Sequence, residues 1–295
     1  MTQSQTTQNP LDKYEKPPFP KQQQQPTGSE AQMQPKPDYG EESYKGSGKL
    51  TGKAAIITGG DSGIGRAVAL AYAREGADVL FTYLEADQDA EETIRVVEGS
   101  GRKVIAMKGD VGDESFCKQV VQRAVREFGH LDILVNNAGY QQTHEHITEI
   151  SSDEIERVFR TNILSMFWLC KAAANELRPG GAVINTASIE AYQPEPVLLD
   201  YSATKGAIVT FTKGLAKQFI ENGIRVNAVA PGPVWTPLIP MSMPAEYVSK
   251  FGQSSPMKRP AQPVEVAPAY VFLASNEASY INGEILGVTG GELLA

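Results

Sequence analysis

Tyr201 and Lys205 are the residues whose types and spacing point most directly to acid–base chemistry. They open an expected helix at positions i and i+4, so both side chains lie on one face, one turn apart. A tyrosine hydroxyl has an ordinary pKa near ~10 and moves protons poorly at neutral pH, but a nearby ammonium lowers that pKa. Tyr201 would then exchange a proton with an alcohol or carbonyl oxygen as a hydride moves. Alone, the pair is weak evidence, because most such pairs are ordinary helical residues.

A glycine-rich stretch, 58–65, lies between the first expected strand and the helix after it. Its residues are Thr58, Gly59, Gly60, Asp61, Ser62, Gly63, Ile64 and Gly65. Glycines permit a tight turn and let backbone N–H groups approach a phosphate, while the helix N-terminus adds partial positive charge. A plain structural turn is the alternative. Its place after the first strand of a βαβ series favours a dinucleotide site.

The charges after the second strand bear on the choice between NAD and NADP. No Lys or Arg occurs from Glu75 to Ile94, and Arg66 is the only cation nearby in the sequence. The acidic residues there are Glu85, Asp87, Asp89, Glu91 and Glu92. Because they would repel a 2′-phosphate, we expect NAD rather than NADP.

Short apolar runs alternate with helical patterns from Leu50 onward. The expected strands are 54–58, 79–83, 104–107, 133–136, 183–185, 226–230 and 285–288, and the expected helices include 64–75, 114–128, 153–174, 201–220 and 263–275. This alternation predicts an α/β fold: a single doubly wound Rossmann domain, with a parallel sheet of about seven strands and helices on both faces. Ligands bind at the carboxyl ends of such strands, where Ser188, 136–139 and 231–233 are expected.

Six motifs occur in order: TGxxxGIG at 58–65, NNAG at 136–139, Asn162, Ser188, YxxxK at 201–205 and PGxxxT at 231–236. Through them the chain resembles the short-chain dehydrogenase/reductase family over residues 50–295. Within it, the chain is most similar to the branch named for glucose and ribitol dehydrogenases and bacterial general stress proteins. That closer likeness is carried by 59–63, 199–201, 231–240 and a Pro/Gln-rich N-terminal extension.

The resemblance implies a role for each matched residue. Tyr201 would be the general acid/base, and Lys205 would lower its pKa and bind the nicotinamide ribose. Ser188 would hydrogen-bond the substrate oxygen, and Asn162 would hold a backbone site and water that feed protons to Lys205. The expected cofactor-binding residues are Thr58, Gly59, Asp61, Ser62, Gly63, Ile64, Gly65, Tyr83, Asp110, Val111, Asn137, Ala138, Gly139, Tyr201, Lys205, Pro231, Gly232, Val234 and Thr236. Asp110 and Val111 would flank the adenine, and Tyr83 replaces the Asp usual in NAD users of the family.

The expected substrate-binding residues are Ser188, Glu190, Tyr192 and Trp235. Polar groups beside an aromatic ring suit a sugar or polyol, although a generic surface rim has the same composition. The segment 236–252 contains three prolines and occupies the place of the family's substrate-covering loop. An ordinary connector is the alternative for this segment.

Residues 1–48 have Leu11 as their only large aliphatic side chain and should be disordered or extended on the body. They are predicted to be a separate extension from the Rossmann domain, 49–295. A solvated tail is one interpretation. The other is an arm across a neighbouring subunit, anchored by Tyr14, Phe19, Tyr39 and Tyr44.

Composition excludes several classes of partner. The net charge of −8 argues against nucleic acid or an anionic membrane, and there is neither an apolar spanning run nor a secretory signal. Cys117 and Cys170 lack a metal or redox motif, so we expect reduced thiols, no metal site, a cytoplasmic location and a small-molecule substrate. The resemblance implies a homotetramer with 222 symmetry, built on helices 153–174 and 201–220 and the C-terminal strand.

The favoured function is that of an NAD(P)-dependent dehydrogenase or reductase acting on an alcohol or carbonyl group, possibly of a sugar or polyol. A 3-oxoacyl reductase is a second hypothesis in the same class. A catalytically silent NAD-binding stress protein is the third, and the presence of Asn162, Ser188, Tyr201 and Lys205 argues against it.

Overall fold

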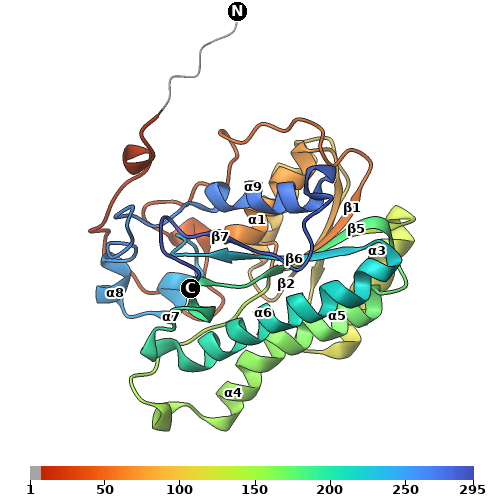
Figure 1. Cartoon of the computed structure of the whole chain (residues 1–295). Coiled ribbons are helices and arrows are strands. Elements are labelled where there is room, and N and C mark those ends of the chain that lie inside the picture. Colours follow the sequence, from red (N-terminus) through yellow and green to blue (C-terminus); the bar gives the residue numbers. More distant parts are fainter. Residues whose placement is uncertain (1–7) are drawn as a thin grey trace, which may run out of the picture.

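A sheet of parallel strands forms the centre of the computed structural model, which describes residues 8–295 (Figure 1). Its order is β3-β2-β1-β4-β5-β6-β7. The strands are β1 (Ala54–Thr58), β2 (Asp78–Tyr83), β3 (Val104–Lys108), β4 (Leu131–Asn136), β5 (Leu177–Thr186), β6 (Arg225–Pro231) and β7 (Ile285–Val288). The central strands β1, β4 and β6 are buried throughout, as strands covered on both faces must be.

Helices cover both faces of this sheet (Figure 1). Their bounds are α1 (Gly63–Arg74), α2 (Asp87–Glu98), α3 (Glu114–Phe128), α4 (Ser152–Phe159), α5 (Ser165–Ala173), α6 (Leu199–Phe219), α7 (Leu238–Ser242), α8 (Ala245–Ser249) and α9 (Pro263–Ala274). Side chains of α1, α2 and α9 share one apolar core with the sheet, and those of α3, α5 and α6 share another. The doubly wound α/β architecture expected from the alternating pattern is therefore confirmed.

The strand order changes direction between β1 and β4. The chain adds β2 and β3 on one side of β1, then crosses back and adds β4 to β7 on the other side. Strand β1 pairs with β2 on one side and with β4 on the other, so the crossovers lead to opposite faces. At such a switch point the loops after the two strands diverge and leave a crevice at their carboxyl ends. The glycine-rich turn after β1 and the NNAG segment after β4 form the edges of that crevice.

The single helix expected over 153–174 is instead two α-helices joined by a π-helical turn, Arg160–Leu164. A π turn contains one residue more than an α turn, which rotates the residues that follow. Asn162 lies within it and is fully buried. Apolar spacing did not reveal this insertion, because both flanking helices retain their own buried faces.

The described part of the N-terminal extension, residues 8–48, lies in an extended form along the body of its own chain, with short 3₁₀ turns at Pro10–Asp12 and Glu30–Gln32. In Figure 1 it runs from the region of α8 and α7 toward α1 and α9. Its four aromatic anchors all contact residues of the same chain: Tyr14 bonds Asp38, Phe19 packs on Trp235, Tyr39 bonds Glu92, and Tyr44 bonds Glu75. These contacts give the aromatic side chains partners without a neighbouring subunit.

None of the helices formed by residues 8–295 has both the length and the apolar character needed to cross a bilayer.

Candidate active site

A cavity of about 650 Å³ opens along the carboxyl ends of the strands. This volume lies within the ~300–1,000 Å³ typical of small-molecule and cofactor sites. It brings together the following expected site residues: Gly59, Asp61, Ser62, Gly63, Ile64, Tyr83, Asp110, Val111, Asn137, Ala138, Gly139, Ser188, Glu190, Tyr201, Lys205, Pro231, Gly232, Val234 and Thr236. Thr58, Gly65, Asn162, Tyr192 and Trp235 do not line it.

The glycine-rich turn at one end of the cavity has a shape that only glycine permits. Gly59 and Gly63 adopt positive φ angles of 62° and 53°. A Cβ on Gly65 would lie 1.9 Å from the Gly59 carbonyl oxygen. The turn therefore brings backbone close to any molecule at the start of α1, a cradle that fits the diphosphate of a dinucleotide.

Thr58 supports this turn from behind the cavity. Its hydroxyl accepts hydrogen bonds from the backbone N–H groups of Asn137 and Ala138, at 2.9 and 3.0 Å. The Asn137 amide in turn donates to the carbonyl oxygens of Thr58 and Gly59, at 3.0 and 3.1 Å. The two edges of the crevice are thus held to each other by four hydrogen bonds.

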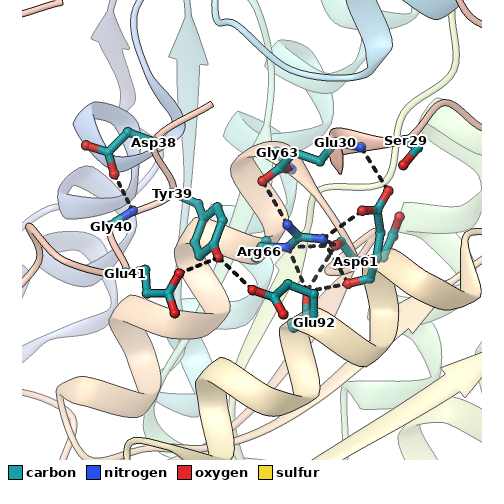
Figure 2. A network of polar contacts seen from close by, with 12 residues as sticks. Ser29, Glu30, Asp38, Tyr39, Gly40, Glu41, Asp61, Gly63, Arg66 and Glu92 are labelled. Atoms are coloured by element: carbon teal, nitrogen blue, oxygen red, sulfur yellow. Dashed lines mark hydrogen bonds and ion pairs between the residues drawn. The ribbon is translucent and has the colours of Figure 1, made fainter. Parts of the chain in front are cut away.

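Arg66, the one cation expected near the ribose end, is enclosed in a buried polar network (Figure 2). Its guanidinium donates to carboxylates of Glu30 at 2.8 Å and Asp89 at 3.2 Å, and also to the Asp61 carbonyl oxygen. Only 3% of its side chain is exposed. Glu30 also accepts the Gly63 N–H at 2.6 Å. Sequence reasoning missed Glu30, because a residue in an extension without periodicity gives no sign of where it docks.

The remaining charged side chains near the nucleotide end are either acidic or held in ion pairs. Burial raises the pKa of Asp61 to about 6. Asp110, expected beside the adenine, accepts a 2.7 Å bond from Arg157, which also lines the cavity. Lys108, the last residue of β3, pairs with Asp87, the first residue of α2. Arg157 was not expected from sequence, since an exposed helical arginine carries no motif.

Tyr201 and Lys205 lie in the first turns of α6 and face the opposite end of the cavity. The Lys205 Nζ lies 5.2 Å from the centroid of the Tyr201 ring and donates to the Thr186 carbonyl oxygen at 2.8 Å. Ser188, two residues beyond β5, lines the same wall. Both members of the pair are buried, at 8% and 2% exposure.

Burial controls the pKa values of this pair. It raises the pKa of Tyr201 well above the ordinary value, an effect opposed by the contact with the Ser188 hydroxyl and increased by the charge of Glu190. Burial also lowers the pKa of Lys205 to about 7. In the protein alone, the Lys205 ammonium does not lower the Tyr201 pKa as expected. Desolvation dominates instead, because it disfavours the charged form of each residue.

Asn162 acts behind the cavity wall. Its amide donates to the Tyr140 carbonyl oxygen at 2.9 Å and accepts the Tyr140 N–H at 2.8 Å, and it also donates to the Thr204 hydroxyl at 3.1 Å. Thr204 precedes Lys205 on α6. The π turn thereby joins the loop after β4 to α6.

Two of the expected substrate residues lie elsewhere. Trp235 is fully buried, packs on Phe19 and Phe251, and donates its indole N–H to the Pro35 carbonyl oxygen at 2.8 Å. It anchors the extension, because an indole inside the core satisfies its one donor there. Tyr192 packs instead against the apolar core beneath β6 and β7.

The wall beside Tyr201 contains groups without a sequence motif: Gln141, Gln193, Met241, Met243, Tyr247, Phe251 and Glu292. Several belong to 236–252, which forms α7 and α8 over the cavity as the expected covering segment would. Glu190 also lines this end, where its carboxylate accepts the Ser202 hydroxyl at 2.9 Å and the Glu195 N–H at 2.8 Å. Among residues 8–295 no group of three His, Cys, Asp or Glu side chains is placed to hold a metal ion.

Known proteins resemble this chain over nearly its full length. A family model described as enoyl-(acyl carrier protein) reductase matches residues 59–292. General stress protein 39 of Bacillus subtilis is 54% identical over 273 residues, 92% of this chain and 95% of that protein. Glucose and ribitol dehydrogenase homolog 2 of Arabidopsis thaliana is 52% identical over 280 residues, 92% of this chain and 96% of that protein.

Two further proteins bear on the cofactor. NADPH-dependent aldehyde reductase 1, chloroplastic, of Arabidopsis thaliana is 49% identical over 281 residues, covering 93% of this chain and 97% of that protein. The crystal structure of a short chain dehydrogenase from Burkholderia cenocepacia in complex with NADP is 32% identical, with a TM-score of 0.78, and covers 82% of this chain and 98% of that one.

The lowered pKa of Lys205 predicts a pH-dependent stability difference between the cofactor-free wild type and Lys205→Met. Below pH about 7 both folded and unfolded chains carry the charged lysine, and its full burial cost destabilises the folded state. Between 7 and the ordinary value of 10.5 the folded protein has already lost this proton, so the cost disappears as pH rises. We expect Lys205→Met to unfold at a higher temperature below pH 7, with the gain shrinking toward pH 10. Lys213→Met, at an exposed position of the same helix, is the control, and an equally constant difference for both variants would contradict the prediction.

Proposed function

The chain belongs to the short-chain dehydrogenase/reductase family, and we propose that it transfers a hydride between a nicotinamide cofactor and an alcohol or carbonyl carbon of a small polar substrate. One observation carries the proposal: Tyr201, Lys205 and Ser188 meet at one end of a cavity whose other end is the glycine-rich turn. This arrangement suits a dinucleotide lying along the cavity, with its nicotinamide beside the catalytic side chains. When bound, that cofactor supplies or accepts the hydride.

The protein's own groups handle the proton. Because burial keeps the Tyr201 hydroxyl protonated, it is suited to donate a proton to a carbonyl oxygen during reduction. Ser188, on the same wall, would hydrogen-bond that oxygen and stabilise the charge that develops on it. Lys205, with a pKa of about 7, exchanges its own proton near neutral pH and would orient the nicotinamide ribose.

The substrate that we propose is a hydroxylated aldehyde, sugar or polyol. Support comes from the mixed wall beside Tyr201, where Glu190, Gln141 and Gln193 supply hydrogen bonds and Met243 and Phe251 supply apolar surface. The names of the relatives, an aldehyde reductase and a glucose and ribitol dehydrogenase homolog, point the same way. The convergence of Ser188, Tyr201 and Lys205 on the cavity, with Asn162 behind its wall, argues against a silent nucleotide-binding protein. No feature of the cavity favours a 3-oxoacyl substrate over a hydroxylated one.

The choice between NAD and NADP sets this chain's charges against its relatives. A relative and a solved structure are named for NADPH or NADP, which counts against the expectation of NAD. At the proposed ribose end, however, Asp61 and Glu85 line the cavity, while Arg66 is turned into its network with Glu30 and Asp89. A 2′-phosphate there would meet like charge. We therefore propose NAD as the tighter ligand, on the chain's own electrostatics.

We also propose the homotetramer. The helices α4, α5 and α6 lie side by side on one face of the sheet (Figure 1). Support for the tetramer comes from apolar side chains that are exposed on this layer of helices. They are Ile155, Leu164, Phe167 and Leu199. Phe167 packs against Phe211 of α6 with its ring tilted, at 4.4 Å between ring centroids, and is 51% exposed. Apolar surface grouped on helices in this way is typical of an interface between subunits.

The Tyr201→Phe variant tests the reaction. It should retain the cofactor's dissociation constant, because the ring remains, but lose turnover by about 10²–10⁴-fold, because no proton can be exchanged. The assay uses a panel of aldehydes, sugars and polyols with both nicotinamide cofactors. Tyr280→Phe, at a fully exposed position, is the matched control. Undiminished turnover in Tyr201→Phe would remove this residue from the chemistry, and cofactor binding without any wild-type turnover would support a silent binder.

Calorimetric titration of the wild type with NAD⁺ and NADP⁺ tests the cofactor preference. We expect a dissociation constant at least about tenfold lower for NAD⁺, equivalent to ~1.4 kcal/mol of repulsion at the 2′-phosphate. The difference should shrink at high salt, because ions screen exposed charges. Tighter binding of NADP⁺ would reject the electrostatic argument and align this chain with its named relatives.

Phe167→Asp tests the assembly, because an unpaired carboxylate in a closed apolar interface is costly. Light scattering should show a tetramer for the wild type and a smaller species for this variant. Leu11→Asp, on the extension, is the control and should leave the mass unchanged. A monomeric wild type would contradict the proposal outright.

A further inference from the structure

A short part of the N-terminal extension, residues 24–30, lies across the mouth of the active cavity. Pro26 and Thr27 line that cavity together with the glycine-rich turn and with segment 236–243. These are the two walls between which the proposed cofactor would lie. None of the six ordered motifs includes this segment, because those six all lie between residues 58 and 236.

Glu30 fixes the segment to the glycine-rich turn and to the helix α1 that follows it. One carboxylate oxygen accepts the Gly63 N–H at 2.6 Å, and the other accepts Arg66 at 2.8 Å. The Glu30 N–H donates to the Asp89 carboxylate at 2.9 Å. Because Gly63 opens α1, this side chain sets the position of the helix N-terminus that faces the proposed diphosphate (Figure 2).

At the other end, the segment is fixed to the covering segment. The Gln24 N–H donates to the Pro240 carbonyl oxygen at 2.8 Å, and the Thr27 N–H contacts the Met241 sulfur at 3.1 Å. Gly28 has a φ of +56°, and a Cβ there would lie 3.0 Å from the Pro237 side chain. This close approach leaves no room for a larger residue.

The segment between these attachments is closed on itself. The Gln24 side chain accepts the Ser29 N–H and donates to the Ser29 carbonyl oxygen. Residues 24–29 therefore form a compact turn whose two ends are bridged, rather than a loose strand. A movement at one attachment is transmitted to the other through few free torsions.

The ionic attachment at Glu30 is an expensive one. The carboxylates of Glu30 and Asp89 bond the single Arg66 guanidinium, the charge of Asp61 acts on the same group, and burial raises the pKa of Glu30 to about 7. An apolar contact of the same size would stabilise the fold at lower cost, since desolvation of buried ion pairs often exceeds their attraction. A buried charge placed on the first N–H of the cofactor-binding helix is better explained by positioning than by stability.

We propose that residues 24–30 form a clasp across the cofactor cleft, with Glu30 as the positioning residue that holds the glycine-rich turn against segment 236–243. The inference rests on the cofactor site proposed above. The clasp bridges the two walls after the nucleotide is in place, so the nucleotide leaves only when one attachment opens. It acts mainly on the rate of cofactor dissociation, the rate through which contacts of this kind usually set affinity.

The test compares dissociation of NADH, and of NADPH in parallel, from full-length wild type, Glu30→Gln and Gly28→Val. Stopped-flow displacement by excess oxidised cofactor follows the fluorescence of the reduced nicotinamide. Glu30→Gln removes the charge at one attachment, and Gly28→Val separates the other from Pro237. Because the two changes weaken different attachments, each should speed dissociation by about tenfold or more. The KM for the cofactor should rise while the KM for the substrate stays near the wild-type value.

Glu277→Gln is the matched control. It removes a surface ion pair with Lys49, the residue that directly follows the extension. It should leave the dissociation rate unchanged. Thermal unfolding of all variants separates a stability loss from a loss of positioning, and Gly28→Val keeps the test open if Glu30→Gln fails to fold.

Wild-type dissociation rates in a folded Glu30→Gln or Gly28→Val variant would overturn the clasp and leave the proposed function intact. A wild type that binds neither NADH nor NADPH would overturn both. Faster release in Glu277→Gln as well would also overturn the clasp, because the effect would then follow from any loosening of the extension.

Discussion

Two hydrogen bonds, which the Thr58 hydroxyl accepts from the backbone N–H groups of Asn137 and Ala138, join the halves of the sheet at the switch point between β1 and β4. Strands β1 and β4 are neighbours there, yet their helices leave toward opposite faces, so the loops between them would otherwise separate freely. With those bonds in place, the glycine-rich turn and the NNAG segment form a fixed corner. The nucleotide end of the cavity, the network around Arg66 and the segment laid over both are all positioned relative to this corner.

Desolvation is the dominant force at the other end of the cavity. Tyr201 and Lys205 are each pushed toward their neutral forms: the Tyr201 hydroxyl keeps its proton, and Lys205, with a pKa of about 7, loses part of the charge that its ordinary pKa would give it at neutral pH. The two desolvated side chains lie one turn apart on the same helix. Thr186 from β5 accepts a hydrogen bond from Lys205, and Asn162 from the π turn bonds Thr204 of that helix. A bound dinucleotide would change the surroundings of both groups, which makes proton exchange conditional on the cofactor's presence.

The sheet could be predicted from sequence because its strands are short apolar runs separated by helical periodicity, and the motif residues could be placed because parallel strands all end at one edge. The π turn around Asn162 could not, since one inserted residue leaves apolar spacing almost unchanged. Trp235 was expected at the substrate, but its neighbour in space is Phe19, more than two hundred positions away in the chain. Glu30 was missed for the same reason: contacts of high sequence separation leave no local pattern.

The route of the extension has a consequence for how the molecule is made. Residues 10 to 38 find their partners in Trp235, Ser249, Arg259 and Gln262, which are synthesised two hundred or more positions later. Docking must therefore wait until these partners have been synthesised, which at ~5–20 residues per second takes many seconds. A nascent chain that has not yet reached Trp235 would expose the extension without its partners and an incomplete cavity. The site therefore closes only after these distant partners have been synthesised.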